Sequence, residues 1–259
     1  MAPTPYVAGL LAAIAAPDAP QKGAILAALT PPDDGATWDS PAIPHRPGRA
    51  TGIVEGAASR RRKGIESIAG LRRFLHAIWH IELEAIDLAC LMALRGPDMP
   101  RAFHADCLHV AREEAEHAQL IADWLRRAGW PPGSEPVHHR LWDAARVCEG
   151  LGEQLVAVPR FLEARGLDVN AGLLPRVAPV DTAAHAVLSR IYHDEINHVA
   201  IGTRWHRHWC AQQGIDPEIH FTDVVRRRFA DHLPSPWPLD HGGRTAAGFS
   251  ATEMAVVGT

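Results

Sequence analysis

The chain has 259 residues, 47% of them apolar, and a formal net charge of −4. This length suits one large domain with a substantial buried core. The acidic balance gives no reason to expect a nucleic-acid partner, and no apolar run approaches the roughly 20 residues of a membrane-spanning helix.

Cysteine usage and the first residues bear on the cellular compartment. The four cysteines stand far apart in apolar segments, as reduced thiols of an intracellular protein do. The apolar run at residues 7–16 lacks the preceding Lys or Arg of a secretory signal. We therefore expect a cytoplasmic protein that makes no membrane contact.

Residues 1–62 are rich in Pro, Gly and Ala and predict a segment that wraps the main domain. Helical patterns in this segment are limited to residues 7–15 and 21–29. The stretch from 30 to 54 is expected to be irregular.

Residues 63–213 predict four long amphipathic helices, at 65–94, 101–128, 141–165 and 181–213. Gly166 is expected to end the third helix and Pro159 to kink it. The short first connection predicts an antiparallel hairpin. The longer connection at 129–140 permits the crossover of ferritin-like bundles.

The tail, residues 214–259, predicts a helix near 217–232 and a short helix after Ser250. Ser250 and Glu253 have the spacing of a capping box, in which each side chain bonds the other residue's backbone. The sequence therefore predicts an all-α fold. We expect a ferritin-like four-helix bundle with an extra N-terminal segment, and with C-terminal helices packed on the bundle.

Two stretches repeat a carboxylate and an imidazole three residues apart: Glu114 with His117, and Glu195 with His198. In a helix, both side chains of such a pair project from one face, about one turn apart. Bundles that bind two metal ions use this pair twice and add one Glu from each of two other helices. One such pair is common on charged helix surfaces, but two in a helical chain predict a dinuclear metal site.

Helix geometry separates buried carboxylates from solvated ones, since each residue advances about 100° around the axis. On the first long helix, Glu82 falls within the apolar stripe, whereas Glu84 and Asp87 fall on the opposite side, where solvent is expected. Both Glu-x-x-His pairs also fall on apolar faces. Buried carboxylates are costly without partners, and divalent cations supply the missing charge.

The sequence does not decide which carboxylate of the third helix faces inward. Glu149 and Glu153 fall away from its apolar stripe, and Glu163 lies off the edge of that stripe if the helix is ideal. A kink at Pro159 shifts the register, so geometry favours Glu163 without settling it.

An ordered set of motifs runs through residues 76–89 (HAIWHIELEAIDLA), 111–117 (AREEAEH), 158–168 (VPRFLEARGLD) and 191–199 (IYHDEINHV). These stretches resemble a ferritin-like family known as domain of unknown function 455, over about residues 60–210. The resemblance implies a bundle with a dinuclear iron centre. It implies these ligands: Glu82, Glu114, His117, Glu163, Glu195 and His198. Trp79 departs from the family pattern, in which a small residue is common, and we expect it to reshape a pocket.

Four carboxylates and two imidazoles form a hard, oxygen-rich donor set that suits iron or manganese better than structural zinc. We expect two iron ions, with a manganese–iron pair as the alternative. The predicted function is that of an oxidoreductase that activates dioxygen, as a hydroxylase or oxygenase of a small or modified substrate. Tyr192 and Asp194 are candidates for hydrogen bonds to the ligands. The alternative interpretation is that Tyr192 is an ordinary core tyrosine and Asp194 a solvated aspartate.

Two other functions fit the same residues. One is iron handling, as a ferroxidase or peroxide scavenger, and the other is a non-catalytic structural protein that a metal stabilises. We expect a small-molecule substrate and dioxygen as reaction partners, and we also consider an electron-donor protein and a homodimer. The charge does not favour a nucleic-acid substrate.

Overall fold

The computed structural model describes residues 3–56, 64–233 and 237–258. These residues form an all-α helical bundle in which the one bridge of β type joins Glu55 and Val137. Within the same ranges, no helix combines the length and apolar character needed to cross a membrane. The expected all-α fold class is confirmed.

The chain divides into two compact units. The first unit comprises Met1–Asp143 and Val180–Val187, and the second comprises Ala144–Pro179 and Leu188–Thr259. These units do not coincide with the expected segments, whose boundaries lie after residues 62 and 213. The expected bundle, residues 63–213, therefore has helices in both units.

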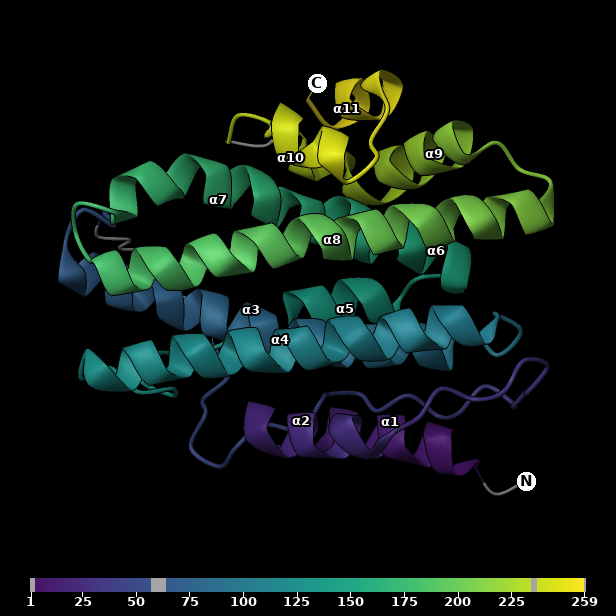
Figure 1. Ribbon diagram of the computed structural model, residues 1–259, viewed down its shortest axis with the longest axis horizontal. Coiled ribbons are helices and arrows are strands. Elements are labelled where there is room, and N and C mark those ends of the chain that lie inside the picture. The colour runs from purple at the N-terminus through teal and green to yellow at the C-terminus, as the bar shows by residue number, and fades with distance from the viewer. Residues whose placement is uncertain (1–2, 57–63, 234–236, 259) are drawn as a thin grey trace. The chain divides into compact units, whose positions relative to one another are not determined.

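The first unit is built on two short and two long helices, which appear in purple to teal in Figure 1. They are α1 (Pro5–Ala15), α2 (Ala19–Ala28), α3 (Ile68–Leu94) and α4 (Arg101–Arg127). Helices α3 and α4 form the expected antiparallel hairpin, α1 packs on α3, and α2 packs on α4. Polar side chains start three of these helices by accepting backbone N–H groups, as N-caps do: Thr4, Asp18 and Ser67.

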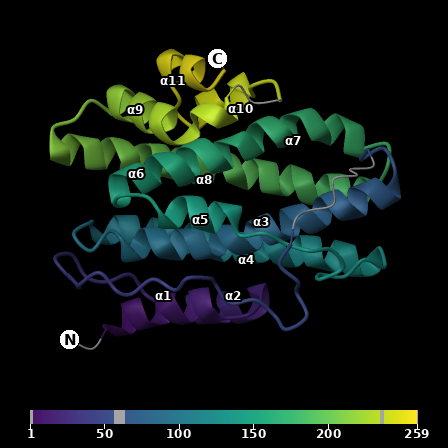
Figure 2. The ribbon, with the colours of Figure 1, turned by 180° about the vertical axis from the view of Figure 1, so that it is seen from behind.

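The second unit contains shorter helices together with most of the long helix α8 (Thr182–Gln213), and Figure 2 shows it from behind. The shorter elements are α6 (Leu151–Leu155), η1 (Val156–Glu163), α7 (Ala164–Val177), α9 (Pro217–Phe229), η2 (Ala230–His232), α10 (His241–Ala246) and α11 (Ala251–Gly258). Helix α5 (Arg140–Arg146) lies across the boundary in sequence. The core of this unit combines aliphatic side chains with four phenylalanines, and Phe161 stacks on Phe229 at 4.0 Å between ring centroids.

The prediction of one continuous third helix ending at Gly166 is wrong. Gly150 adopts a φ of 123°, which separates α5 from α6, whereas the helix continues through Gly166 to Val177. The expected irregularity at Pro159 takes the form of a π-helix, η1. Proline cannot donate the usual hydrogen bond, and a π-helix instead bonds residues five apart and so changes the register.

The C-terminal tail follows the prediction closely. Helix α9 and the 3-10 turn η2 together cover residues 217–232. The backbone N–H of Ser250 donates to the Glu253 carboxylate at 3.0 Å, and the Glu253 N–H donates to the Ser250 hydroxyl at 3.2 Å. The capping box at the start of α11 is therefore confirmed. Helix α10, which Asp240 caps, was not expected.

Candidate metal centre

Three of the expected ligands meet in the first unit. Glu82 lies on α3, and Glu114 and His117 lie one turn apart on α4; all three are buried. His117 Nδ1 is 3.4 Å from Glu82 Oε2 and 3.4 Å from Glu114 Oε2. One donor atom from each side chain lies within 4.8 Å of the others. Two carboxylates and an imidazole thus face the same small space.

The electrostatics of this group show what burial costs. Burial raises the pKa of Glu82 well above its usual value, and the adjacent Glu114 carboxylate raises it further. Burial opposes protonation of His117, but Glu114 and Glu82 outweigh that effect and raise its pKa to about 11. A proton on His117 therefore offsets the charge of one carboxylate in this group.

The second unit carries the other Glu-x-x-His pair on α8. Glu195 and His198 are both buried, and His198 Nδ1 lies 3.8 Å from Glu195 Oε1. Glu163 is partly buried and is the last residue of the π-helix η1. The expected donors of this unit are therefore two carboxylates and one imidazole, the same set as in the first unit.

The two candidates for hydrogen bonds to the ligands have contacts of other kinds. The Tyr192 hydroxyl donates to Asp240 Oδ2 at 2.5 Å, and Asp240 in turn caps α10. Asp194 accepts from Arg190, four residues earlier on α8, at 3.4 Å. The first contact favours the plainer interpretation of Tyr192, a tyrosine with a satisfied hydroxyl, whereas the role of Asp194 stays a prediction.

The expectation that Glu84 and Asp87 face solvent is wrong, because both are fully buried. Asp87 Oδ1 accepts from Lys22 Nζ at 2.7 Å, and Asp87 Oδ2 accepts from Arg49 Nη1 at 2.9 Å. Glu84 bonds His139 Nδ1 at 2.9 Å. The far side of α3 is covered by α1 and by charged partners from distant segments, so the helical period alone could not reveal its burial.

Glu153, expected away from the apolar stripe, is likewise buried, and it binds Arg227 and Arg228 of α9. Trp79 lines a pocket, and its expected effect on the shape of a pocket stays a prediction. The sequence also left two buried clusters unnoticed, although i, i+4 spacing marks each of them. The first is His80, Glu84 and His139; the second is His206, Cys210 and His220.

Hydrogen bonds within the protein already engage side chains of both clusters. Arg49 Nε donates to His80 Nε2 at 3.2 Å, and Arg160 Nη1 donates to His206 Nδ1 at 2.9 Å. A guanidinium only donates, so each acceptor nitrogen is unprotonated and already in use. Burial, assisted by these arginines, lowers the pKa of His80 and of His206 to about 2, which keeps both rings neutral.

The chain belongs to the family described as "Protein of unknown function (DUF455)", whose profile matches residues 12–255. It is similar to an uncharacterized protein of Haemophilus influenzae, with 37% identity over 167 residues. The match covers 61% of this chain and 58% of that relative, less than two thirds of the relative's length. No solved structure matches the chain. The family membership that the motifs indicated is confirmed, and neither description names an activity.

Proposed function

We propose that the chain binds two iron ions in one dinuclear centre and uses them to activate dioxygen for the oxidation of a small or modified substrate. The proposed ligands are Glu82, Glu114, His117, Glu163, Glu195 and His198. The observation that carries the proposal is the meeting of Glu82, Glu114 and His117 in a buried space, with the imidazole 3.4 Å from both carboxylates. A second buried Glu-x-x-His pair on α8 supports it.

The donor set fits the charge of two divalent ions. Four carboxylates and two neutral imidazoles carry a net charge of −4, which two divalent cations balance. Oxygen-rich sets with imidazole suit iron or manganese, and thiolates, which structural zinc prefers, are absent from this set. When bound, two ferrous ions would supply two of the four electrons that reduction of dioxygen to water needs, and the oxidised substrate would supply the other two.

The chain's own residues hold the ligands and manage the protons. The raised pKa of His117 favours its protonated form between Glu82 and Glu114, and the imidazole would release that proton on becoming a metal ligand. Burial of all three side chains keeps bulk water from the carboxylates. The short α3–α4 connection holds the two helices as neighbours and so keeps Glu82 against His117.

Metal content and oxygen consumption test this function together. Wild-type protein from iron-replete cells is expected to contain about two iron atoms per chain, and its ferrous form is expected to consume dioxygen. Glu114→Ala removes a buried ligand, so both iron content and oxygen consumption should fall at least tenfold. Glu116→Gln, on the exposed side of the same helix, is the matched control and should match wild type.

The outcomes also separate the alternatives. Unchanged oxygen consumption in Glu114→Ala would contradict the proposal. Iron-free protein after iron-replete expression would favour a non-catalytic protein. Continued oxidation of added ferrous iron, with the ferric product retained, would favour iron handling over substrate oxidation.

A further inference from the structure

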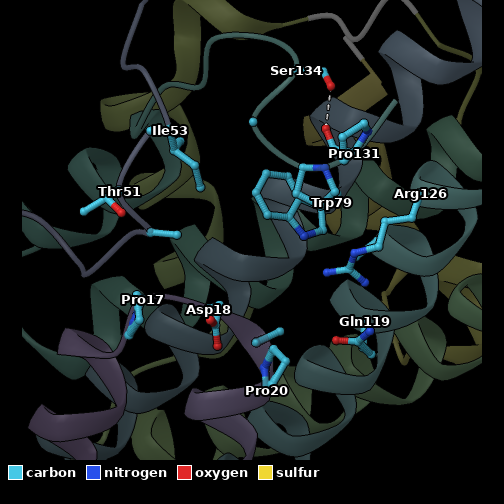
Figure 3. A pocket seen from close by; sticks show the side chains of 16 residues that line it. Pro17, Asp18, Pro20, Thr51, Ile53, Trp79, Gln119, Arg126, Pro131 and Ser134 are labelled. Atoms are coloured by element: carbon cyan, nitrogen blue, oxygen red, sulfur yellow. Dashed lines mark hydrogen bonds between the residues drawn. The ribbon is translucent and has the colours of Figure 1, made fainter. Parts of the chain in front are cut away.

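A pocket of about 450 Å³ opens in the first unit, apart from the proposed metal ligands. Residues 17–20 at the start of α2 line it, together with two loop segments at 50–53 and 131–134, Trp79 of α3 and two polar side chains of α4. Figure 3 shows Trp79 between Ile53 and Arg126, facing a hollow that Asp18, Pro20 and Gln119 close from the other side. A volume of this size is enough for a small organic molecule.

Trp79 brings a hydrogen-bond donor to this pocket. Its side chain is only 4% exposed, and its indole touches the rings of His76 and His80. The structure describes no hydrogen bond from its indole N–H, and this atom is not among the buried polar atoms that lack a partner, so solvent reaches it. In Figure 3 the ring nitrogen lies on the side of the hollow. An indole N–H only donates, so an acceptor atom of a ligand in the pocket would be its natural partner.

Arg126 and Gln119 supply the other polar groups. Gln119 Nε2 and Arg126 Nη1 both donate to Asp123 Oδ1 at 2.7 Å. This shared partner leaves the Gln119 carbonyl oxygen as an acceptor and the remaining guanidinium N–H groups as donors. Both side chains extend toward the hollow in Figure 3. Because Arg126 and Asp123 are about half exposed, their mutual attraction is weak and leaves Arg126 able to bind an anion.

The remaining walls are apolar and rigid. Pro17, Pro20 and Pro131 present rings, and Ile53 adds an aliphatic side chain. Among the described residues that line the pocket, Asp18 is the only acidic one, and each of its carboxylate oxygens accepts a hydrogen bond from Gln21, at 2.9 and 3.1 Å. The pocket therefore combines flat apolar walls, donors for an anion, and one amide acceptor.

We propose that this pocket binds a small aromatic carboxylate with a hydroxyl group on its ring. The carboxylate accepts hydrogen bonds from Arg126 and from the Trp79 indole, the ring packs on the prolines, and the hydroxyl donates to Gln119. No lining residue is a proposed metal ligand, so the inference stands independently of the metal centre.

Calorimetric titration with 4-hydroxybenzoate tests the proposal on the full chain, with and without bound metal. Wild type should bind saturably in both forms. Arg126→Gln should bind about tenfold more weakly, since a charge-assisted hydrogen bond is lost. Trp79→Phe should bind about threefold to tenfold more weakly, and 4-hydroxybenzyl alcohol, which lacks the charge, should bind more weakly than the acid.

Arg127→Gln is the matched control, because Arg127 is exposed on the same helix and does not line the pocket. It should bind 4-hydroxybenzoate as wild type does. Absence of saturable binding by wild type would overturn the proposal, as would equal affinity in wild type and Arg126→Gln. Arg126 is a surface residue, so its variant remains informative even if Trp79→Phe fails to fold.

Discussion

The carboxylate of Glu153 illustrates how single residues hold the second unit together. Arg228 Nη2 donates to Glu153 Oε2 at 2.6 Å, and Arg227 Nη1 donates to Glu153 Oε1 at 2.8 Å. Burial alone would raise the pKa of Glu153, but the hydrogen bonds from Arg228 and from the backbone of Glu149, with the charge of Arg227, outweigh it. The pKa therefore lies below its usual value of 4.5.

Glu153→Gln is expected to lower the free energy of unfolding by about 1–3 kcal/mol at pH 7, since hydrogen bonds to a charged group are lost. A depressed folded pKa stabilises the fold above the unfolded value, near 4.5, and this contribution disappears as the pH falls through the folded pKa. Urea unfolding from pH 7 to pH 3 should therefore show the two proteins converging at low pH.

Glu149→Gln is the control for this series. The Glu149 side chain is exposed. Its backbone N–H donates to the Glu153 carboxylate, and the substitution leaves that bond in place. Its stability should stay within about 0.5 kcal/mol of wild type. A Glu153→Gln deficit that is the same at pH 3 as at pH 7 would contradict the assigned ion pair.

The sequence predicted the burial of some carboxylates and missed that of others, and the two groups differ in one physical respect. Glu82, Glu114 and His117 lie on apolar stripes, and a stripe is a property of its own helix, so the sequence reveals it. Glu84 and Asp87 lie opposite the stripe, and their burial depends on Lys22 and Arg49, which come from elsewhere in the chain. The helical period shows which face of a helix is apolar. It does not show which other segments cover the opposite face.

At the scale of the element, the π-helix η1 depends on a glycine of α8. A methyl group at Gly202 would overlap the Pro159 ring, which packs against it. Gly202→Ala is therefore expected to lower the free energy of unfolding by about 1–3 kcal/mol, since a proline ring cannot rotate out of the way. The unfolding midpoint in urea measures this loss.

Gly166→Ala is the matched control. Gly166 lies within α7, and a methyl group there would meet nothing within 4 Å. The substitution should be neutral or stabilise the fold by up to about 1 kcal/mol, because alanine favours a helix over glycine. If both glycine variants lost the same stability, close packing of Pro159 on Gly202 would not be the cause.

Two glycines, Gly150 and Gly166, explain why the third helix was predicted incorrectly. Gly150 and Gly166 are equally capable of ending a helix, but only Gly150 takes a positive φ. The choice between them depends on packing around each residue, which the chain order does not contain. Caps made by local side chains, such as Ser250 with Glu253, were predicted because the interacting groups are three residues apart.

At the scale of the whole molecule, the proposed ligand set is distributed over both units. Glu82, Glu114 and His117 belong to the first unit, and the other three proposed ligands belong to the second. A single dinuclear centre requires the ligands of both units together, whereas each of two independent sites would require only the ligands of its own unit. Family membership extends over residues 12–255 and so includes both sets, but it names no metal.

Mössbauer spectroscopy of iron-replete protein tests the dinuclear centre most directly. The wild-type chain is expected to hold about two iron atoms that are magnetically coupled. Glu114→Gln in the first unit and Glu195→Gln in the second should each abolish the coupled signal. Iron-free protein, uncoupled iron in wild type, or a coupled pair that persists in Glu195→Gln would contradict the dinuclear centre.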